Sequence, residues 1–183
     1  ERSGGIMCKI LKELRGKSAL ELLEKYNISM KPPINIDLLL YKIGISAIPI
    51  NFNEVETEVG LEANEILGAT ISNGENLSIF YQDKATNNRK RFTLAHEIAH
   101  CCIHSDNLID HHVELRANIT ANTTKEYQAN IFAGELLIPK RSLLEIYEKL
   151  LHPTLDSLAK IFEVSPMVMK ARLEYLELPY NNE

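Results

Sequence analysis

The chain contains the stretch Arg91-Phe-Thr-Leu-Ala-His96-Glu97-Ile-Ala-His100, and its interpretation decides the fold. The two histidines are four residues apart, so on a helix both imidazoles project from the same face and can bind one metal ion. Glu97 follows the first histidine and would then act on a water molecule held at the metal rather than on the metal itself. The pattern predicts a zinc site, with His96 and His100 as ligands and Glu97 as the general base.

The residues around this motif favour a buried helix, which we expect to run from about Lys90 to His104. Its apolar residues are Phe92, Leu94, Ala95, Ile98, Ala99 and Ile103. Cys101 and Cys102 follow His100 directly, but on a helix they point about 100° and 200° away from it. We therefore expect both cysteines to be small buried hydrophobic residues and not thiolate ligands of the metal.

Length, composition and charge are those of an ordinary globular domain. The chain has 183 residues, of which 45% are hydrophobic and 25% are charged, enough for one substantial core. No apolar run approaches the ~20 residues that span a membrane, and no signal-peptide pattern is present, so we expect neither a membrane partner nor secretion. Residues 1–6 are expected to be a remnant of expression. A net charge of -5 disfavours nucleic acid as the main partner.

The cysteines indicate the compartment. Cys8, Cys101 and Cys102 are an odd number, and two of them are adjacent, which does not suit a disulfide framework. We therefore expect a protein of the reducing cytoplasm.

The rest of the chain divides into helices and a short run of strands. Periodicity, capping residues and helix breakers predict helices over residues 17–26, 35–43, 124–138, 142–151, 154–162 and 165–178. β-branched and aromatic residues predict strands over 45–52, 66–72 and 77–82, the last two joined as a hairpin by Asn73-Gly-Glu-Asn76. One strand of this hairpin is either internal or an edge that pairs with an extended substrate.

These elements predict an α+β fold in one domain over residues 7–183. A small, mostly antiparallel sheet is expected to pack on the helix that carries the two histidines, with further helices on its flanks. The N-terminal helices and first strand cover 7–65, the hairpin and zinc-site core 66–139, and the C-terminal helices 140–183. The polar residues 105–124 predict a long loop over the site.

A catalytic zinc usually has three protein ligands, and three carboxylates compete for the third position. Asp106 lies ten residues after His96, where it would need a tight glycine turn at position 103; that residue is Ile103, so the helix should carry Asp106 away. Glu126 lies near the start of the next predicted helix, which can pack on the first. Glu135 is nine residues further on, about 180° around that helix. The pattern favours Glu126.

Other polar residues are candidates for supporting roles. Asn130 lies four residues after Glu126, hence on the same face, and its amide oxygen can accept a hydrogen bond from the non-ligating nitrogen of a ligand histidine. His104 and Tyr127 are candidates for contacting the substrate or for stabilising the oxyanion of the transition state. His111 and His112 are further candidates for the same role.

Two blocks in this order resemble a known family. The first is Arg91-Phe-Thr-Leu-Ala-His-Glu-Ile-Ala-His100, and the second is Glu126-x-x-Ala-Asn-x-Phe-Ala-x-Glu-Leu-Leu-Ile-Pro139. With His104 between them, they resemble the ImmA/IrrE metallopeptidases over about residues 17–178. The resemblance implies a zincin-like fold, with His96, His100 and Glu126 binding Zn²⁺ and Glu97 as the base. It also implies an intracellular protease that cleaves helix-turn-helix repressors and so induces mobile-element, prophage or stress genes.

Two other functions stay open at this stage. Residues 154–176 have the spacing of a helix-turn-helix, a DNA-binding unit in many regulators. Its second helix begins with Pro166, Met167, Val168 and Met169, where donors that read bases belong, so a packing unit or a surface for a protein partner is favoured over direct DNA binding. The other alternative is a regulatory module whose metal site is latent or structural, with residues 105–124 covering the cleft.

Overall fold

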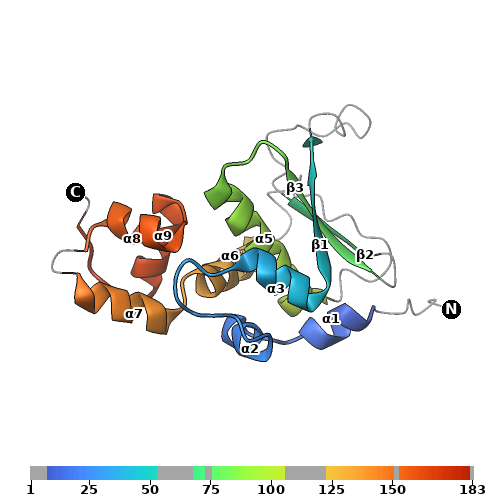
Figure 1. The fold of residues 1–183 in the computed structure, drawn as a ribbon, viewed down its shortest axis with the longest axis horizontal. Coiled ribbons are helices and arrows are strands. Elements are labelled where there is room, and N and C mark those ends of the chain that lie inside the picture. The colour runs from blue at the N-terminus through green and yellow to red at the C-terminus, as the bar shows by residue number, and fades with distance from the viewer. Residues whose placement is uncertain (1–7, 53–67, 73–75, 106–122, 151–152, 182–183) are drawn as a thin grey trace.

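The computed structural model describes residues 8–52, 68–72, 76–105, 123–150 and 153–181. Its helices are α1 (Lys9–Leu14), α2 (Ala19–Lys25), α3 (Ile36–Ile43), α5 (Asn87–Ile103), α6 (Thr123–Leu137), α7 (Lys140–Lys149), α8 (Leu155–Phe162) and α9 (Pro166–Tyr175). Its strands are β1 (Ile45–Ile50), β2 (Gly68–Ser72) and β3 (Leu77–Gln82). Figure 1 shows the sheet at one end, α5 and α6 in the middle, and α7–α9 at the other end.

Helices α2 and α3 begin and end where the sequence predicts. Ser18 and Glu21 form a capping box at the start of α2, in which each side chain accepts a hydrogen bond from the backbone N–H of the other residue. Asn35 caps α3 by accepting from Leu38 N–H at 2.9 Å, and Gly44 ends it in the left-handed region, at φ 89°. Helix α1 was not predicted, because six residues are too few for helical periodicity to show.

The described strands form one sheet in the order β1-β3-β2. β2 and β3 are antiparallel, with Ser72 opposite Leu77, which confirms the predicted hairpin. β1 runs parallel to β3, with Ile45 opposite Leu77, so the sheet is mixed and the expected antiparallel pairing holds for the hairpin alone. A turn signal fixes the relative direction of adjacent strands, whereas nothing local to β1 fixes its direction against β3. Among the described residues β2 is an edge strand.

Helix α5 is the centre of the fold. It lies between α6 and the sheet (Figure 1). Its residues Leu94, Ala95, Ile98 and Ala99 have no exposed surface. Thr86 caps its first turn, and it ends at Ile103, with His104 as the cap. The predicted buried helix is confirmed, and its start lies at Asn87 rather than at about Lys90. None of the described helices, α5 included, has the length and apolar character needed to cross a membrane.

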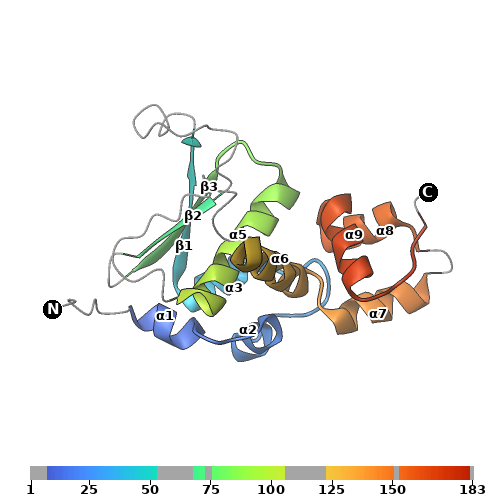
Figure 2. The ribbon, with the colours of Figure 1, turned by 180° about the vertical axis from the view of Figure 1, so that it is seen from behind.

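Figure 2 shows the C-terminal helices at the far end from the sheet. A buried arginine connects them to α5. Arg91 donates hydrogen bonds to the carbonyl oxygens of Glu163, at 3.1 Å, and Phe162, at 3.4 Å. Asn88 donates to the carbonyl oxygen of Val164 at 3.0 Å. Burial lowers the pKa of Arg91, and the Glu163 carboxylate, 3.9 Å away, opposes this shift. Arg91 thus satisfies carbonyl groups at the end of α8 that lack helical partners.

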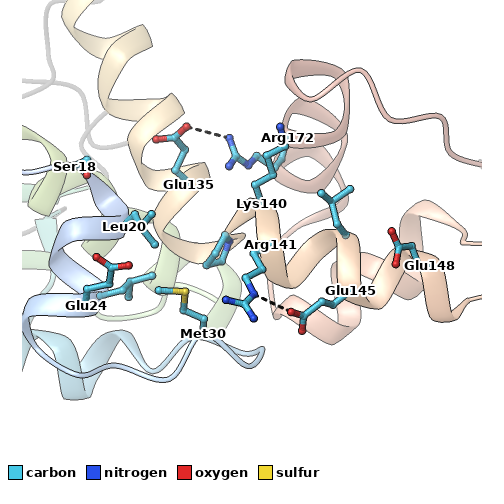
Figure 3. A pocket seen from close by; sticks show the side chains of 13 residues that line it. Ser18, Leu20, Glu24, Met30, Glu135, Lys140, Arg141, Glu145, Glu148 and Arg172 are labelled. Atoms are coloured by element: carbon cyan, nitrogen blue, oxygen red, sulfur yellow. Dashed lines mark hydrogen bonds and ion pairs between the residues drawn. The ribbon is translucent and has the colours of Figure 1, made fainter.

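A second buried arginine ties α9 to α6. Arg172 Nε donates to the carbonyl oxygen of Ile138 at 3.1 Å, and its Nη1 lies 3.4 Å from Oε1 of Glu135 (Figure 3). Burial lowers the pKa of Arg172, and the Glu135 carboxylate opposes this shift. Two buried cations therefore hold the C-terminal helices against the two central helices.

Replacing Arg91 by alanine should lower the free energy of unfolding by about 1–3 kcal/mol, because buried carbonyl groups at the end of α8 lose their donor. Urea denaturation followed by circular dichroism measures this change. Arg89→Ala, at an exposed position on the same helix, is the control, with an expected change below about 0.5 kcal/mol. Equal stability of Arg91→Ala and the unaltered protein would show that these hydrogen bonds contribute nothing.

Candidate metal centre

Three side chains from α5 and α6 converge on one point. His96 and His100 project from the same face of α5 and are buried, and Glu126 approaches them from the first turns of α6. Nε2 of His96 lies 3.2 Å from Oε2 of Glu126, and Nε2 of His100 lies 3.2 Å from Oε1. The two Nε2 atoms are 2.8 Å apart. The structure thus brings together the three residues that the sequence singles out as ligands.

This donor set fits a single zinc-like ion. Two imidazole nitrogens and a carboxylate oxygen are ligands that zinc accepts, and they leave a fourth position open. In a tetrahedron whose ligands lie about 2.0–2.1 Å from the ion, neighbouring ligand atoms are about 3.3–3.4 Å apart. The two Nε2 atoms are 2.8 Å apart, and each lies 3.2 Å from a different oxygen of Glu126, so a small movement of the side chains accommodates the ion on one of these oxygens.

Asn130 orients the first histidine. Its Oδ1 accepts a hydrogen bond from Nδ1 of His96 at 2.8 Å, from a position one turn after Glu126 on α6. With the proton on Nδ1, the lone pair of Nε2 points toward Glu126 and is available to a metal. This is the contact that the spacing of Glu126 and Asn130 predicts.

Glu97 projects from α5 toward the sheet instead of toward α6. Its Oε2 accepts a hydrogen bond from Oγ1 of Thr70, on β2, at 2.8 Å, and both residues are buried. A buried carboxylate bound by a hydroxyl group is restricted in its rotamer, so Thr70 fixes the direction in which Glu97 acts. Reasoning from the sequence missed Thr70.

Gly68 permits the close approach of β2 to α5. A Cβ atom at this position would lie 2.5 Å from Cγ2 of Thr93 and 3.1 Å from Oε1 of Glu97. Gly68 and Thr70 are two residues apart on one strand, so they share the face that meets Glu97. The alternation along β2 puts the two residues on one face, but it does not indicate that this face meets Glu97.

A comparison with protein families bears on this site. The profile of the M78 peptidases, described as the IrrE N-terminal-like domain, matches residues 52–174. The chain belongs to this family. A search of curated proteins gave no match. The family resemblance inferred from the two sequence blocks is confirmed, and so are the zincin-like α+β fold and a metallopeptidase function.

His104 and Tyr127, the candidates for contacting the substrate or the oxyanion, differ in burial and contacts. The ring of His104 lies 5.4 Å from that of His100, and its Nε2 donates to the backbone carbonyl of Lys125 at 3.3 Å. This contact joins the end of α5 to the start of α6. Tyr127 is 63% exposed, next to Glu126. Roles for His104 and Tyr127 in catalysis stay predictions.

The other candidate residues do not belong to the described metal-binding group. Glu135 contacts Arg172 (Figure 3). Among the described residues, the group that could hold a metal contains Glu126 instead. Asp106, His111 and His112 lie outside the described residues, as does nearly all of the loop predicted over 105–124.

The adjacent cysteines are not placed for thiolate chemistry. Cys101 and Cys102 are both buried. Burial raises the pKa of Cys102 to about 12 and raises that of Cys101 well above its usual range. Both therefore stay thiols at neutral pH, as small buried hydrophobic residues. This agrees with the sequence prediction.

Two glutamates of α6 give a matched test of the ligand set. Glu126→Gln should lose most bound zinc, because a neutral amide is a much poorer ligand than a carboxylate. Glu135→Gln, on the same helix, should keep about one zinc per chain. Dialysis against zinc followed by elemental analysis measures both. Full occupancy in Glu126→Gln would remove this residue from the ligand set.

Proposed function

We propose that this M78 peptidase is a zinc-dependent endopeptidase that cleaves a helix-turn-helix transcriptional repressor. The observation that carries the proposal is the meeting of His96, His100 and Glu126. Glu97 lies next to His96 on the same helix, and its carboxylate accepts a hydrogen bond from Thr70 on β2. The substrate is supported by the resemblance to the ImmA/IrrE metallopeptidases. Cleavage would then release genes of mobile elements, prophages or stress responses from repression.

The side chains divide the chemistry between them. His96, His100 and Glu126 would hold the ion, which when bound polarises the scissile carbonyl group and acidifies water. Glu97 takes a proton from the attacking water and passes it to the leaving amine. Thr70 keeps Glu97 in position, and Asn130 keeps the proton of His96 on Nδ1. Burial of His96, His100, Glu97 and Thr70 strengthens the electrostatic interactions among them.

A cytoplasmic location is part of the proposal. It is supported by Cys8, Cys101 and Cys102, which are all free and buried. Unpaired cysteines are the rule in reducing compartments, where repressors also act.

The charges of α9 support a protein substrate over direct DNA binding. Of the basic residues of this helix, Arg172 is buried against Glu135 and Ile138, and Lys170 lies 3.9 Å from Glu174. The exposed residues at its start are Pro166 and Met167. A recognition helix needs free cations for phosphate groups and polar donors for bases, and the described part of α9 offers few of either.

Glu97→Gln should keep the metal and lose cleavage by at least about a hundredfold, because the general base is removed while the ligands stay. The assay uses the zinc-loaded protein and the purified helix-turn-helix repressor encoded beside its gene, with products identified by mass spectrometry. Full activity of Glu97→Gln would reject the assignment of the base. A zinc-loaded but inactive unaltered protein would favour a regulatory module with a structural metal.

Thr70→Val should lower kcat roughly tenfold with little change in KM, because a charged hydrogen bond that positions Glu97 is lost while the shape is kept. Thr70→Ser retains the hydroxyl group and should recover most of the activity. Steady-state kinetics on the same substrate measures both variants. An equal fall in Thr70→Ser and Thr70→Val would show that the methyl group matters and the hydroxyl group does not.

A further inference from the structure

A groove of about 930 Å³ lies between α9 and the two central helices. Its lining is mainly apolar: Phe92 from α5, Tyr127 and Ile131 from α6, and Met167, Val168 and Ala171 from α9. This volume is at the upper end of the range for pockets that enclose small ligands, so it has ample room for a large amino-acid side chain.

The groove lies next to the metal centre, because two of its lining residues contact His96. Asn130 lines it and also binds Nδ1 of His96. The ring of Phe92, another lining residue, lies 6.1 Å from the ring of His96. Tyr127 follows Glu126 directly on α6. A chain bound at the metal centre therefore reaches the groove within one or two residues.

The wall formed by α9 is fixed in place, and its surface is apolar and exposed. Arg172 secures it to α6, and Arg91 secures the turn that precedes it to α5. Met167 is 77% exposed and Tyr175 is 51% exposed. Exposed apolar side chains that gather in a concave site are typical of binding surfaces.

The lining of the groove offers little net charge for binding a ligand. Its exposed charged residues, Arg89 and Glu174, have opposite signs, and the lining Arg172 is already paired with Glu135. Recognition therefore depends on burial of apolar surface.

The groove drawn in Figure 3 differs from this one in its charge and in its distance from the metal centre. It lies between α2 and the α6–α7 region and is rimmed by several charged residues. Its lining includes neither Asn130 nor Phe92, the two residues that join the first groove to His96. Its charged rim includes Glu24, Lys140, Arg141, Glu145 and Glu148.

We propose that the groove between α9 and the central helices is the specificity site of the enzyme, and that it receives a large apolar side chain next to the scissile bond of a protein substrate. This rests on the proposed peptidase function. The helix-turn-helix-like unit α8–α9 is then a wall of the substrate cleft, and its second helix reads a polypeptide rather than a base pair.

The test uses the zinc-loaded Glu97→Gln protein as bait for a display library of short random peptides, so that binding is measured without cleavage. Selected peptides should be enriched in Leu, Met or Phe at one position. Ala171→Trp fills the groove from an exposed position of α9 and should weaken their binding by about tenfold or more, the worth of burying one such side chain. Lys170→Trp, the neighbouring residue, does not line the groove and should leave affinity unchanged.

Met167→Asp serves as a second variant, because its exposed side chain can be changed without loss of folding, and it should weaken binding in the same way. A library without binders, binders without an apolar preference, or equal affinity for the protein with and without Ala171→Trp would each overturn the proposal. Incubation of the selected peptides with the active protein then distinguishes the proposed binding site from the proposed peptidase function. Peptides that bind in the groove but are never cut would reject the peptidase proposal and leave the binding site standing.

Discussion

The packing of α5 between the sheet and α6 is the constraint on which the rest of the molecule depends. Its apolar side chains anchor it in the core, so its polar side chains have fixed directions. His96 and His100 meet α6, and Glu97 meets β2. The proposed ligands and the proposed base thus leave one helix toward different neighbours. Each neighbour supplies the partner that a buried polar group requires.

The same helix couples the metal centre to the C-terminal helices. Arg91 precedes His96 by five residues and binds the end of α8, so α5 and the α8–α9 turn are positioned relative to one another. Arg172 in the same way fixes α9 relative to α6, through its hydrogen bond to Ile138. Buried cations are costly unless they are paired and hydrogen-bonded, and both arginines are. A rigid wall beside the metal centre follows from these two contacts.

Local signals in the sequence predicted much of this arrangement. Helical spacing is enough to place His96 and His100 together, and Asn130 above Glu126, because both pairs lie within single helices. Capping residues such as Asn35 and Gly44 gave the bounds of α3 correctly. The approach of α6 to α5 was inferred from chemistry, since a zinc site needs a third ligand.

Contacts between distant segments were not predictable in this way. The hydrogen bond from Thr70 to Glu97 depends on the placement of β2 against α5, which no pattern within either element encodes. The parallel direction of β1 against β3 likewise depends on how distant segments pack and not on a local pattern. The groove beside the metal centre depends on how α9 is held, and Arg91 and Arg172 reveal this only once their partners are known.

The central claim is that α5 and α6 together provide one zinc-binding site. X-ray absorption at the zinc edge of the loaded protein tests it most directly. The account predicts a shell of nitrogen and oxygen ligands at about 2.0–2.1 Å that includes two imidazoles. A sulfur shell at about 2.3 Å would contradict it, because the metal would then be bound by cysteine rather than by His96, His100 and Glu126.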